Sequence, residues 1–320
     1  MTATTQTILS AYQVRKSKAQ KRAFAAYLKE IAEQNGYTYR EERGSFGATN
    51  LIVGDPSRAK FLCTAHYDTC ARLPFPNFIT PKRFDIYLLY QLLLTVLLLL
   101  PAAVVLFGLP TLLLLLGASD AAAFGIGGFV AYLALIATML LILVGPANKH
   151  TANDNTSGVT VLVDTMLAMP PELRDQVAYV FFDLEEAGLF GSASYRAKHK
   201  KETKRQLLIN FDCVSDGDHL LLVLRKGAHR FADVLAEAFP AEDGKLQREI
   251  CRRGVFYPSD QSNFPCGVGV AALKKSRKLH ILYMNRIHTR RDTVYEAENI
   301  SYLTNGCIRL AALLSEQENI

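Results

Sequence analysis

The sequence predicts a three-layer α/β domain around a mainly parallel mixed sheet, interrupted by a transmembrane hairpin of two helices. The α/β domain is indicated by short apolar runs that alternate with segments of helical spacing. The hairpin is indicated by a leucine-rich, almost uncharged stretch from Ile86 to about Val144. Apolar residues make up 50% of the 320-residue chain, and because their excess lies in this stretch, the rest resembles an ordinary globular protein.

This stretch divides the chain into three segments. Residues 1–80 form the first part of the globular domain, residues 84–146 the hairpin, and residues 147–320 the second part of the domain. The alternative is a hydrophobic hairpin buried inside a soluble protein, but helices that are apolar on every face need a very large protein to cover them. We therefore expect the hairpin to insert into a lipid bilayer.

The apolar stretch is long enough for two spans. Ile86 to Leu116 carries no charge and would extend about 46 Å as one helix, beyond the roughly 30 Å of a hydrocarbon core. We expect a first span over residues 86–108, an apolar turn region ending near Asp120, and a second span over residues 121–144. The candidate positions for a kink or an early end of the first span are Pro101, Gly108 and Pro110.

The charges that flank the hairpin predict its orientation. Arg72, Lys82, Arg83 and Lys149 lie near its outer ends, whereas the turn around Asp120 has no Lys or Arg. By the positive-inside rule, the globular domain of this integral membrane protein faces the cytoplasm. Two spans also return the chain to the side from which it left.

Helices and strands are expected on both sides of the hairpin. Residues 7–34 have apolar residues at helical spacing, which predicts a surface helix or a helix pair. Further helices are expected at Val159–Met169, His229–Ala238 and Leu303–Glu316. The expected strands are Tyr37–Glu41, Asn50–Gly54, Lys60–His66, Gln176–Phe182, Gln206–Phe211, Leu220–Leu224, Val268–Leu273 and Leu279–Met284.

Acidic and histidine motifs stand repeatedly at the ends of expected strands, where polar groups of such sheets converge on a ligand. The set of nitrogen and oxygen donors suits zinc. Their chemistry suggests two metal ions about 3.5 to 4 Å apart that share one carboxylate and a water. Asp68 is placed to orient the imidazole of His66. The candidate ligands are His66, Asp154, Glu186, Asp212 and His288.

These motifs resemble those of the zinc peptidases of metallopeptidase family 28, which contains aminopeptidases, some carboxypeptidases and glutaminyl cyclases. The resemblance covers the globular chain from about residue 20 onward and implies a zinc exopeptidase-like fold. The motifs occur in the family's order. They are His66-Tyr67-Asp68, residues 153–158 (NDNTSG), residues 185–192 (EEAGLFGS), Asn210-Phe211-Asp212, Ser259-Asp260, and His288-Thr289 with Asp292-Thr293.

The resemblance implies a role for each matching residue. Asp154 is similar to the family's bridging carboxylate, with Glu186 and His288 completing one zinc site and His66 and Asp212 the other. Other divalent metals could replace the two Zn²⁺ ions. Glu185 is similar to the general base that takes a proton from the attacking water, and Asp68 to the residue that orients His66.

The chain departs from the family pattern in two respects. Gln261 stands where the family often has His after Ser259-Asp260, so substrate contacts in this loop differ, and Tyr257 and Asp260 are the candidates for them. The hairpin is not part of the usual soluble core. Because it begins some twenty residues after His66 and ends about ten before Asp154, we expect the active site to lie close to the bilayer surface.

The sequence thus predicts a membrane-anchored di-zinc metalloexopeptidase, specifically an aminopeptidase. A glutaminyl cyclase with one zinc is an alternative, against which His66 and Asp212 argue. An inactive receptor or scaffold with a peptidase fold is another, against which the complete ligand set argues. The expected partners are a peptide substrate and the lipid bilayer. The hairpin either gates or presents substrate, such as hydrophobic or membrane-derived peptides, or it only anchors the enzyme.

Composition excludes some other functions. The net charge of +6 comes from scattered clusters such as residues 15–18 (RKSK), without a nucleic-acid motif, so we expect solvated helix faces or contacts to anionic headgroups and no nucleic-acid partner. The six cysteines form no CxxC pair and are expected to be free thiols. Cys70 and Cys213 stand beside the motifs, and we interpret them as packing residues.

Overall fold

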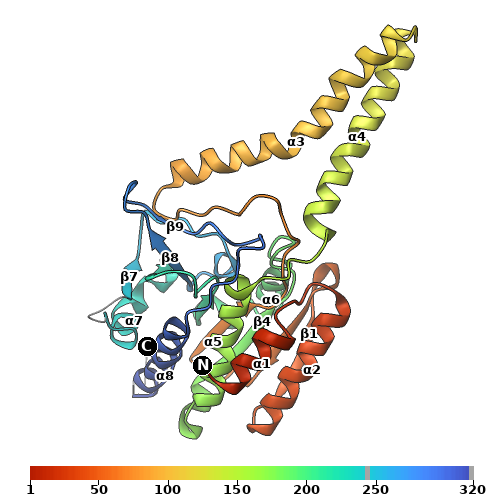
Figure 1. The fold of residues 1–320 in the computed structure, drawn as a ribbon. Coiled ribbons are helices and arrows are strands. Elements are labelled where there is room, and N and C mark those ends of the chain that lie inside the picture. The colour runs from red at the N-terminus through yellow and green to blue at the C-terminus, as the bar shows by residue number, and fades with distance from the viewer. Residues whose placement is uncertain (242–245, 317–320) are drawn as a thin grey trace.

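The computed structural model describes residues 1–241 and 246–316 and shows a mixed α/β domain from which two long helices project (Figure 1). Within the described residues the strands join into one nine-stranded sheet. The strands are β1 (Tyr39–Arg43), β2 (Thr49–Val53), β3 (Phe61–His66), β4 (Val177–Phe182), β5 (Leu207–Phe211), β6 (His219–Leu224), β7 (Gln247–Cys251), β8 (Gly267–Lys275) and β9 (Leu282–Tyr283).

The strand order across the sheet is β1-β2-β4-β3-β5-β8-β6-β7, with β9 paired to β8. The four central strands β4, β3, β5 and β8 are parallel. The pairings of β1 with β2, β2 with β4, β6 with β8 and β8 with β9 are antiparallel, whereas β6 and β7 are parallel. The predicted mixed sheet is confirmed, and the carboxyl ends of its parallel centre face one common edge.

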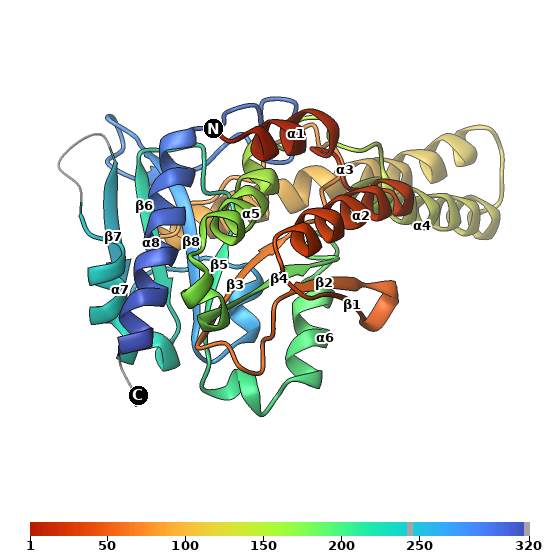
Figure 2. The same cartoon turned by 90° about the horizontal axis from the view of Figure 1, so that it is seen from below.

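Helices cover both faces of the sheet, which makes the three predicted layers (Figure 2). Successive side chains of β3 point to opposite faces of the sheet and so belong to two different hydrophobic clusters. Phe61, Cys63 and Ala65 lie in the main core, whereas Leu62 lies in a cluster with Tyr195 on the opposite face. The main core contains residues of α1 (Ala3–Ala11), α2 (Lys18–Gln34), α5 (Gly158–Ala168), α7 (Ala232–Ala238) and α8 (Ala297–Glu316). The opposite face is covered by α6 (Phe190–Lys198).

The stretch 7–34 belongs to a pair of helices, one of the two expected arrangements, and Ser17 begins the second helix because its hydroxyl accepts the Gln20 N–H in a capping box. Other elements differ from the sequence-based expectation. Only Leu282–Tyr283 of the expected strand 279–284 is a strand. The sequence did not predict β7, whose Gln, Arg and Glu residues give no apolar run. Short helical turns lie at Ser45–Gly47, Ala152–Ser157, Pro171–Gln176, Glu202–Lys204, Lys226–Phe231 and Asp260–Asn263.

The two projecting helices are α3 (Phe84–Leu115) and α4 (Asp120–Val144). Both are long and apolar enough, by length and composition, to cross a membrane. Figure 1 shows α3 bent between a first part that extends over the α/β domain and a second part that runs alongside α4. Pro101 and Pro110 lie inside α3, and prolines of this kind are a common cause of helix bends. The helix nevertheless continues to Leu115, so residues 109–115, expected in the turn region, are helical.

The hairpin helices pack through small residues. Ala123, Gly127 and Ala131 are the buried positions of α4, and they lie four residues apart on one face. Pro110 is buried on α3, and a Cβ atom added to Gly127 would lie 2.3 Å from Pro110 Cγ. Glycine at position 127 therefore allows the two backbones to approach closely.

The chain leaves and re-enters the α/β domain at one place. Ala71 and Ala147 form an antiparallel bridge, the Arg72 N–H donates to the Pro146 carbonyl at 2.8 Å, and the Asn148 N–H donates to the Cys70 carbonyl. On the other side, the Leu73 N–H donates to the His288 carbonyl at 2.8 Å. We call residues 70–73, 145–148 and 284–288 the base ribbon. It ties both ends of the hairpin to the segment that carries His288.

Candidate metal centre

Three neighbouring strands bring acidic and histidine side chains to the same edge of the sheet. His66 is the last residue of β3, Asp212 directly follows β5, and Glu185 and Glu186 follow β4. Because β4, β3 and β5 are adjacent and parallel, these side chains converge. Asp154 comes from the turn Ala152–Ser157 before α5, and His288 from the loop after β9.

Asp154 lies between the two histidines. Its Oδ1 is 3.4 Å from His66 Nε2, and its Oδ2 is 3.1 Å from His288 Nε2. His66 Nε2 is also 3.5 Å from Asp212 Oδ1, and His288 Nε2 is 3.3 Å from Glu186 Oε2. The five predicted ligands thus form two sets, each with one histidine and one carboxylate of its own, that share Asp154.

The electrostatics of this cluster call for bound cations. Asp154, Asp212 and Glu186 crowd their carboxylates into a largely buried space. Asp212 Oδ1 and Glu186 Oε1 are buried and have no hydrogen-bond partner among the described residues. Unpaired buried carboxylate oxygens are costly unless a metal or a donor satisfies them. Oxygen and imidazole donors in this number suit zinc, so the residues present fit two such ions.

Burial and neighbouring charges shift the pKa values of the carboxyl and imidazole groups in the cluster. Burial and the neighbouring carboxylate of Asp154 raise the pKa of Glu186 to about 8. Burial lowers the pKa of His288, but the carboxylates of Glu186 and Asp154 outweigh it and raise that pKa to about 9. Burial would raise the pKa of Asp154, yet hydrogen bonds with both histidines hold it well below its usual range.

Glu185 lies on the side of the His66 set. One of its carboxylate oxygens is within 4.8 Å of ligand atoms of both His66 and Asp212. Burial raises the pKa of Glu185 well above its ordinary value, and nearby Asp212 and Asp260 add to this effect. A carboxylate with a raised pKa beside a metal set is suited to accept a proton from water.

Asp68 makes different contacts from those expected of an imidazole-orienting carboxylate. His66 Nδ1 is 3.1 Å from the backbone carbonyl oxygen of Asp68 and 3.6 Å from its Oδ1. The Asp68 carboxylate instead accepts the N–H groups of Glu185 at 3.1 Å and Glu186 at 3.3 Å. Asp68 therefore orients His66 through its main chain and positions the glutamate pair through its side chain.

Asp292 fixes the loop of the shared carboxylate. It is buried, and its two carboxylate oxygens accept the N–H groups of Asn153 at 2.9 Å and Asp154 at 3.0 Å. Asn155 joins the same loop to the end of β5, since its amide donates to the Phe211 carbonyl. Sequence reasoning assigned no role to Asp292, although this residue stands in the last of the matching motifs.

The two predicted substrate contacts are deeply buried. The Tyr257 hydroxyl donates to the Asp212 carbonyl at 2.9 Å, so it supports the segment that carries the candidate ligand Asp212. Asp260 is buried, and both its carboxylate oxygens lack a hydrogen-bond partner among the described residues. Gln261 is also buried, and its amide donates to the Tyr257 carbonyl at 2.7 Å. Gln261 therefore holds this loop together.

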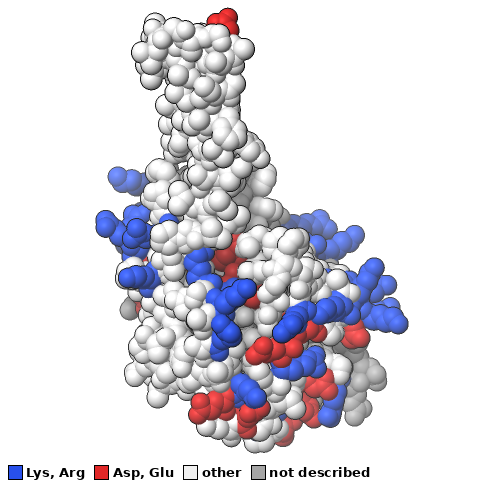
Figure 3. Space-filling model, turned by 90° about the vertical axis from the view of Figure 1, so that its right-hand side faces the viewer, with Lys and Arg blue, Asp and Glu red and all other residues white. Residues whose placement is uncertain are grey.

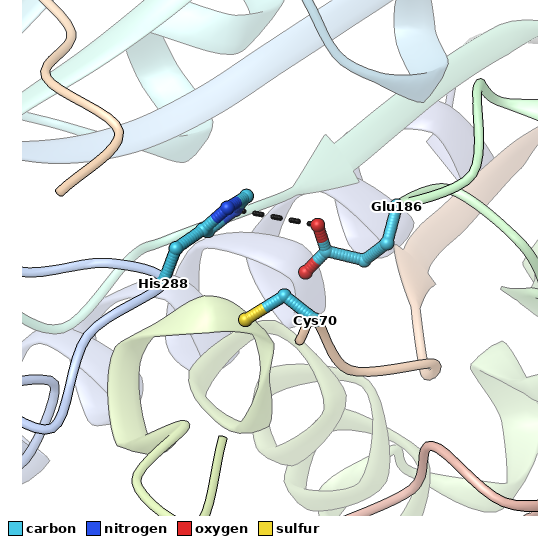
Figure 4. Close-up of side chains that lie close together, drawn as sticks. All are labelled: Cys70, Glu186 and His288. Carbon is cyan, nitrogen blue, oxygen red and sulfur yellow. Dashed lines mark ion pairs between the residues drawn. The ribbon is translucent and has the colours of Figure 1, made fainter. Parts of the chain in front are cut away.

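The two cysteines beside the motifs, Cys70 and Cys213, lie close to the candidate ligands. Figure 4 shows Cys70 next to Glu186 and His288, whose ion pair is drawn, and the three ligand atoms lie within 4.8 Å of one another. Cys213 is similarly placed with Asp154 and Asp212. Burial, followed by nearby carboxylates, raises the pKa of both thiols, so they favour the protonated form, which is a poor metal ligand.

One residue of the basic cluster near the N-terminus is buried, whereas Lys18 is exposed as expected. Arg15 is fully buried, and it donates from Nε to the Tyr67 carbonyl at 2.5 Å and from its guanidinium to Thr156 Oγ1. It thereby ties the α1–α2 connection to the loops that carry His66 and Asp154. Sequence reasoning missed this residue because a buried arginine leaves no periodic signal in a polar linker.

Comparison with known proteins identifies the family. The profile of peptidase family M28 matches residues 136–311, which is more than half of the chain and includes Asp154, Glu185, Glu186, Asp212 and His288. The chain belongs to peptidase family M28. The protein is therefore a zinc metallopeptidase, and the resemblance inferred from the motifs is confirmed.

Solved structures confirm the fold over nearly the whole M28 chain. The LapA aminopeptidase of Legionella pneumophila aligns with a TM-score of 0.54 and 12% identity, covering 99% of this chain and 69% of its own. A glutaminyl cyclase of Bacteroides thetaiotaomicron has a TM-score of 0.52 and 14% identity over 96% of this chain and 94% of its own. A leucine aminopeptidase precursor from the same organism has a TM-score of 0.51, 14% identity, and coverage of 96% and 93%. No curated protein matches the sequence.

Proposed function

We propose that this M28 peptidase is a membrane-anchored di-zinc aminopeptidase that removes N-terminal residues from peptides. The position of Asp154 is the observation that carries the proposal, because its two oxygens face two histidines on opposite sides. A carboxylate in that position can be shared by two metal ions. His66 and Asp212 would hold one ion, and Glu186 and His288 the other.

The two metal-ligand sets and the residues around them would have different roles in peptide-bond hydrolysis. Zinc bound there would polarise the scissile carbonyl and lower the pKa of the attacking water. Glu185 accepts the proton of that water and returns it to the departing amine. Asp68 holds the main chain of Glu185 and Glu186 in place, so that the base and the neighbouring ligand keep their relative positions.

The presence of a second donor set, formed by His66 and Asp212 with the shared Asp154, favours an aminopeptidase over a single-zinc glutaminyl cyclase. A cyclase of that kind would leave His66 and Asp212 without a metal, yet they lie 3.5 Å apart as parts of a converged donor set. The two activities also differ in product, since an aminopeptidase releases an amino acid from a suitable peptide, whereas a glutaminyl cyclase closes an N-terminal glutamine into a ring and releases ammonia.

The hairpin anchors the enzyme with its catalytic domain in the cytoplasm. Figure 3 shows Lys and Arg side chains on both sides of the hairpin base and an acidic group at its tip, where Asp120 begins α4. This distribution supports a cytoplasmic base by the positive-inside rule. Single cysteines introduced at Ser119 and Lys149 test it. A membrane-impermeant thiol reagent applied outside intact cells should label the first and not the second, and the reverse pattern would contradict this orientation.

Glu185→Gln tests the proposed mechanism. We expect it to lower turnover of aminoacyl reporter substrates about 10²- to 10⁴-fold, because a general base typically contributes that much. Its zinc content and circular dichroism should match the wild type, since Glu185 is not among the five ligands. Glu186→Gln is the matched neighbour and should lose zinc as well as activity. Full activity in Glu185→Gln would overturn the mechanism.

A further inference from the structure

A cavity of ≈ 730 Å³ connects the metal centre with the membrane hairpin. Glu186 and His288 line it on one side, and Ile142, Leu143 and Val144 of the last turn of α4 line it on another. One set of metal ligands therefore opens directly beside the point where the apolar hairpin joins the catalytic domain.

The cavity has two apolar walls. Leu143 and Val144 have 50% and 72% of their surfaces exposed. Across the cavity, Phe46 is 79% exposed and packs against Phe190, with ring centroids 4.4 Å apart. Exposed apolar side chains that gather at a binding cavity mark the place where an apolar part of a ligand packs.

The end of α4 is fastened to the catalytic domain. Lys16 Nζ donates to the Leu143 carbonyl at 2.7 Å, which satisfies one of the last carbonyls of the helix. Lys16 follows the buried Arg15, and the base ribbon holds residues 145–148 against residues 70–73. The α4 wall thus has a fixed position relative to Glu186 and His288.

If the hairpin spans the bilayer as proposed, the cavity lies at the level of a bilayer surface. The 25 residues of α4 extend about 37 Å, slightly more than the roughly 30 Å hydrocarbon core. If Asp120 lies at one surface, Leu143 and Val144 lie at the other. Exposed Arg72 lies in the base ribbon, and the segments next to the ribbon carry exposed Lys149, Arg290 and Arg291. Such residues attract anionic headgroups.

We propose that this cavity admits peptides already bound at the membrane surface, an inference that rests on the proposed peptidase function. The N-terminal residue of such a peptide would lie between the α4 wall and the Phe46–Phe190 pair, with its scissile bond over the metal ligands. A peptide held at the surface reaches this entrance at a raised effective concentration. The hairpin then contributes to substrate choice as well as to anchoring.

Photo-crosslinking tests, independently of turnover, whether a membrane-bound peptide enters through this cavity. The zinc-loaded Glu185→Gln protein, in vesicles of phosphatidylcholine and phosphatidylglycerol, is incubated with an acylated peptide that begins with photoreactive leucine. We expect crosslinks to Phe46, Phe190 or residues 142–144. Crosslinks confined to other surfaces, or none, would overturn the inference.

A kinetic comparison tests whether the enzyme prefers membrane-bound peptides. Two peptides share an N-terminal leucine and sequence, but only one carries a fatty acyl chain near its C-terminus. In the same vesicles, wild-type kcat/KM should be about tenfold or more higher for the acylated peptide. Leu143→Asn should reduce this ratio several-fold, whereas Leu115→Asn, a control at an 81% exposed position at the far end of the hairpin, should keep it.

The outcomes separate the two proposals. Two results would overturn the proposed membrane entrance while leaving the aminopeptidase proposal intact. One is an equal ratio of kcat/KM, acylated over non-acylated peptide, in Leu143→Asn and Leu115→Asn. The other is a wild-type ratio near one with both peptides hydrolysed. Crosslinking at the cavity without hydrolysis of either peptide would contradict the aminopeptidase and support the entrance.

Discussion

At the scale of single residues, the convergence of the candidate ligands was predictable and the contacts that support them were not. His66, Glu186 and Asp212 could be proposed because each stands at the end of an apolar run. The carboxylate of Asp292, which holds the Asp154 loop, and that of Asp68, which holds the glutamate pair, act through main-chain contacts. Such contacts depend on where distant loops meet, and no local pattern in the sequence encodes them.

The carboxyl and imidazole groups predict how pH affects the zinc-free protein. In the folded state the pKa of Glu186 is raised to about 8 from 4.5, that of Asp292 to about 8 from 3.8, and that of His288 to about 9 from 6.5. Between the ordinary and the raised values, the folded state binds more protons than the unfolded state, so stability falls as pH rises.

We therefore expect the melting temperature of the zinc-free enzyme to fall between about pH 6 and pH 8, measured by differential scanning calorimetry. Zinc-loaded protein serves as the control. Because metal binding requires deprotonated ligands, its melting temperature should not fall in this range. A zinc-free melting temperature that rises over this range would contradict the assigned shifts.

At the scale of elements, strong periodic or apolar runs were predicted well. The central strands β3, β4 and β5 occupy the expected positions, because each is a continuous apolar run buried on both faces. The division of residues 7–34 into α1 and α2 depends on the capping box at Ser17, and the length of α3 depends on its packing with α4. A local cap therefore decided the first boundary, and packing between helices decided the second.

The contact between α3 and α4 makes a prediction for two adjacent glycines. Gly127→Leu should force the helices apart, because even a Cβ atom would lie 2.3 Å from Pro110 Cγ. Gly128→Leu is the matched control, since a Cβ atom there meets nothing within 4 Å. Overpacking of this kind costs about 1–3 kcal/mol.

Spin labels at exposed Leu106 and Leu133 report the separation of the two helices. The distance distribution should lengthen or broaden in Gly127→Leu and stay that of the wild type in Gly128→Leu. Identical distributions in both variants would show that the hairpin does not pack through Gly127.

At the scale of the whole molecule, an M28 domain is divided by an apolar hairpin that returns to the point where it leaves. The base ribbon joins Ala71 to Ala147 across the hairpin and includes His288. The sequence indicated only that both ends of the hairpin lie near the motifs. Their pairing is a long-range contact between segments without strand periodicity, so only the folded structure reveals it.

The central claim is a centre for two zinc ions shared by Asp154, and the zinc content of the purified full-length protein tests it most directly. Inductively coupled plasma mass spectrometry, normalised to protein by amino-acid analysis, should give two zinc ions per chain, because both donor sets are complete. One zinc per chain under saturating zinc would contradict the shared centre, and none would contradict the zinc enzyme altogether.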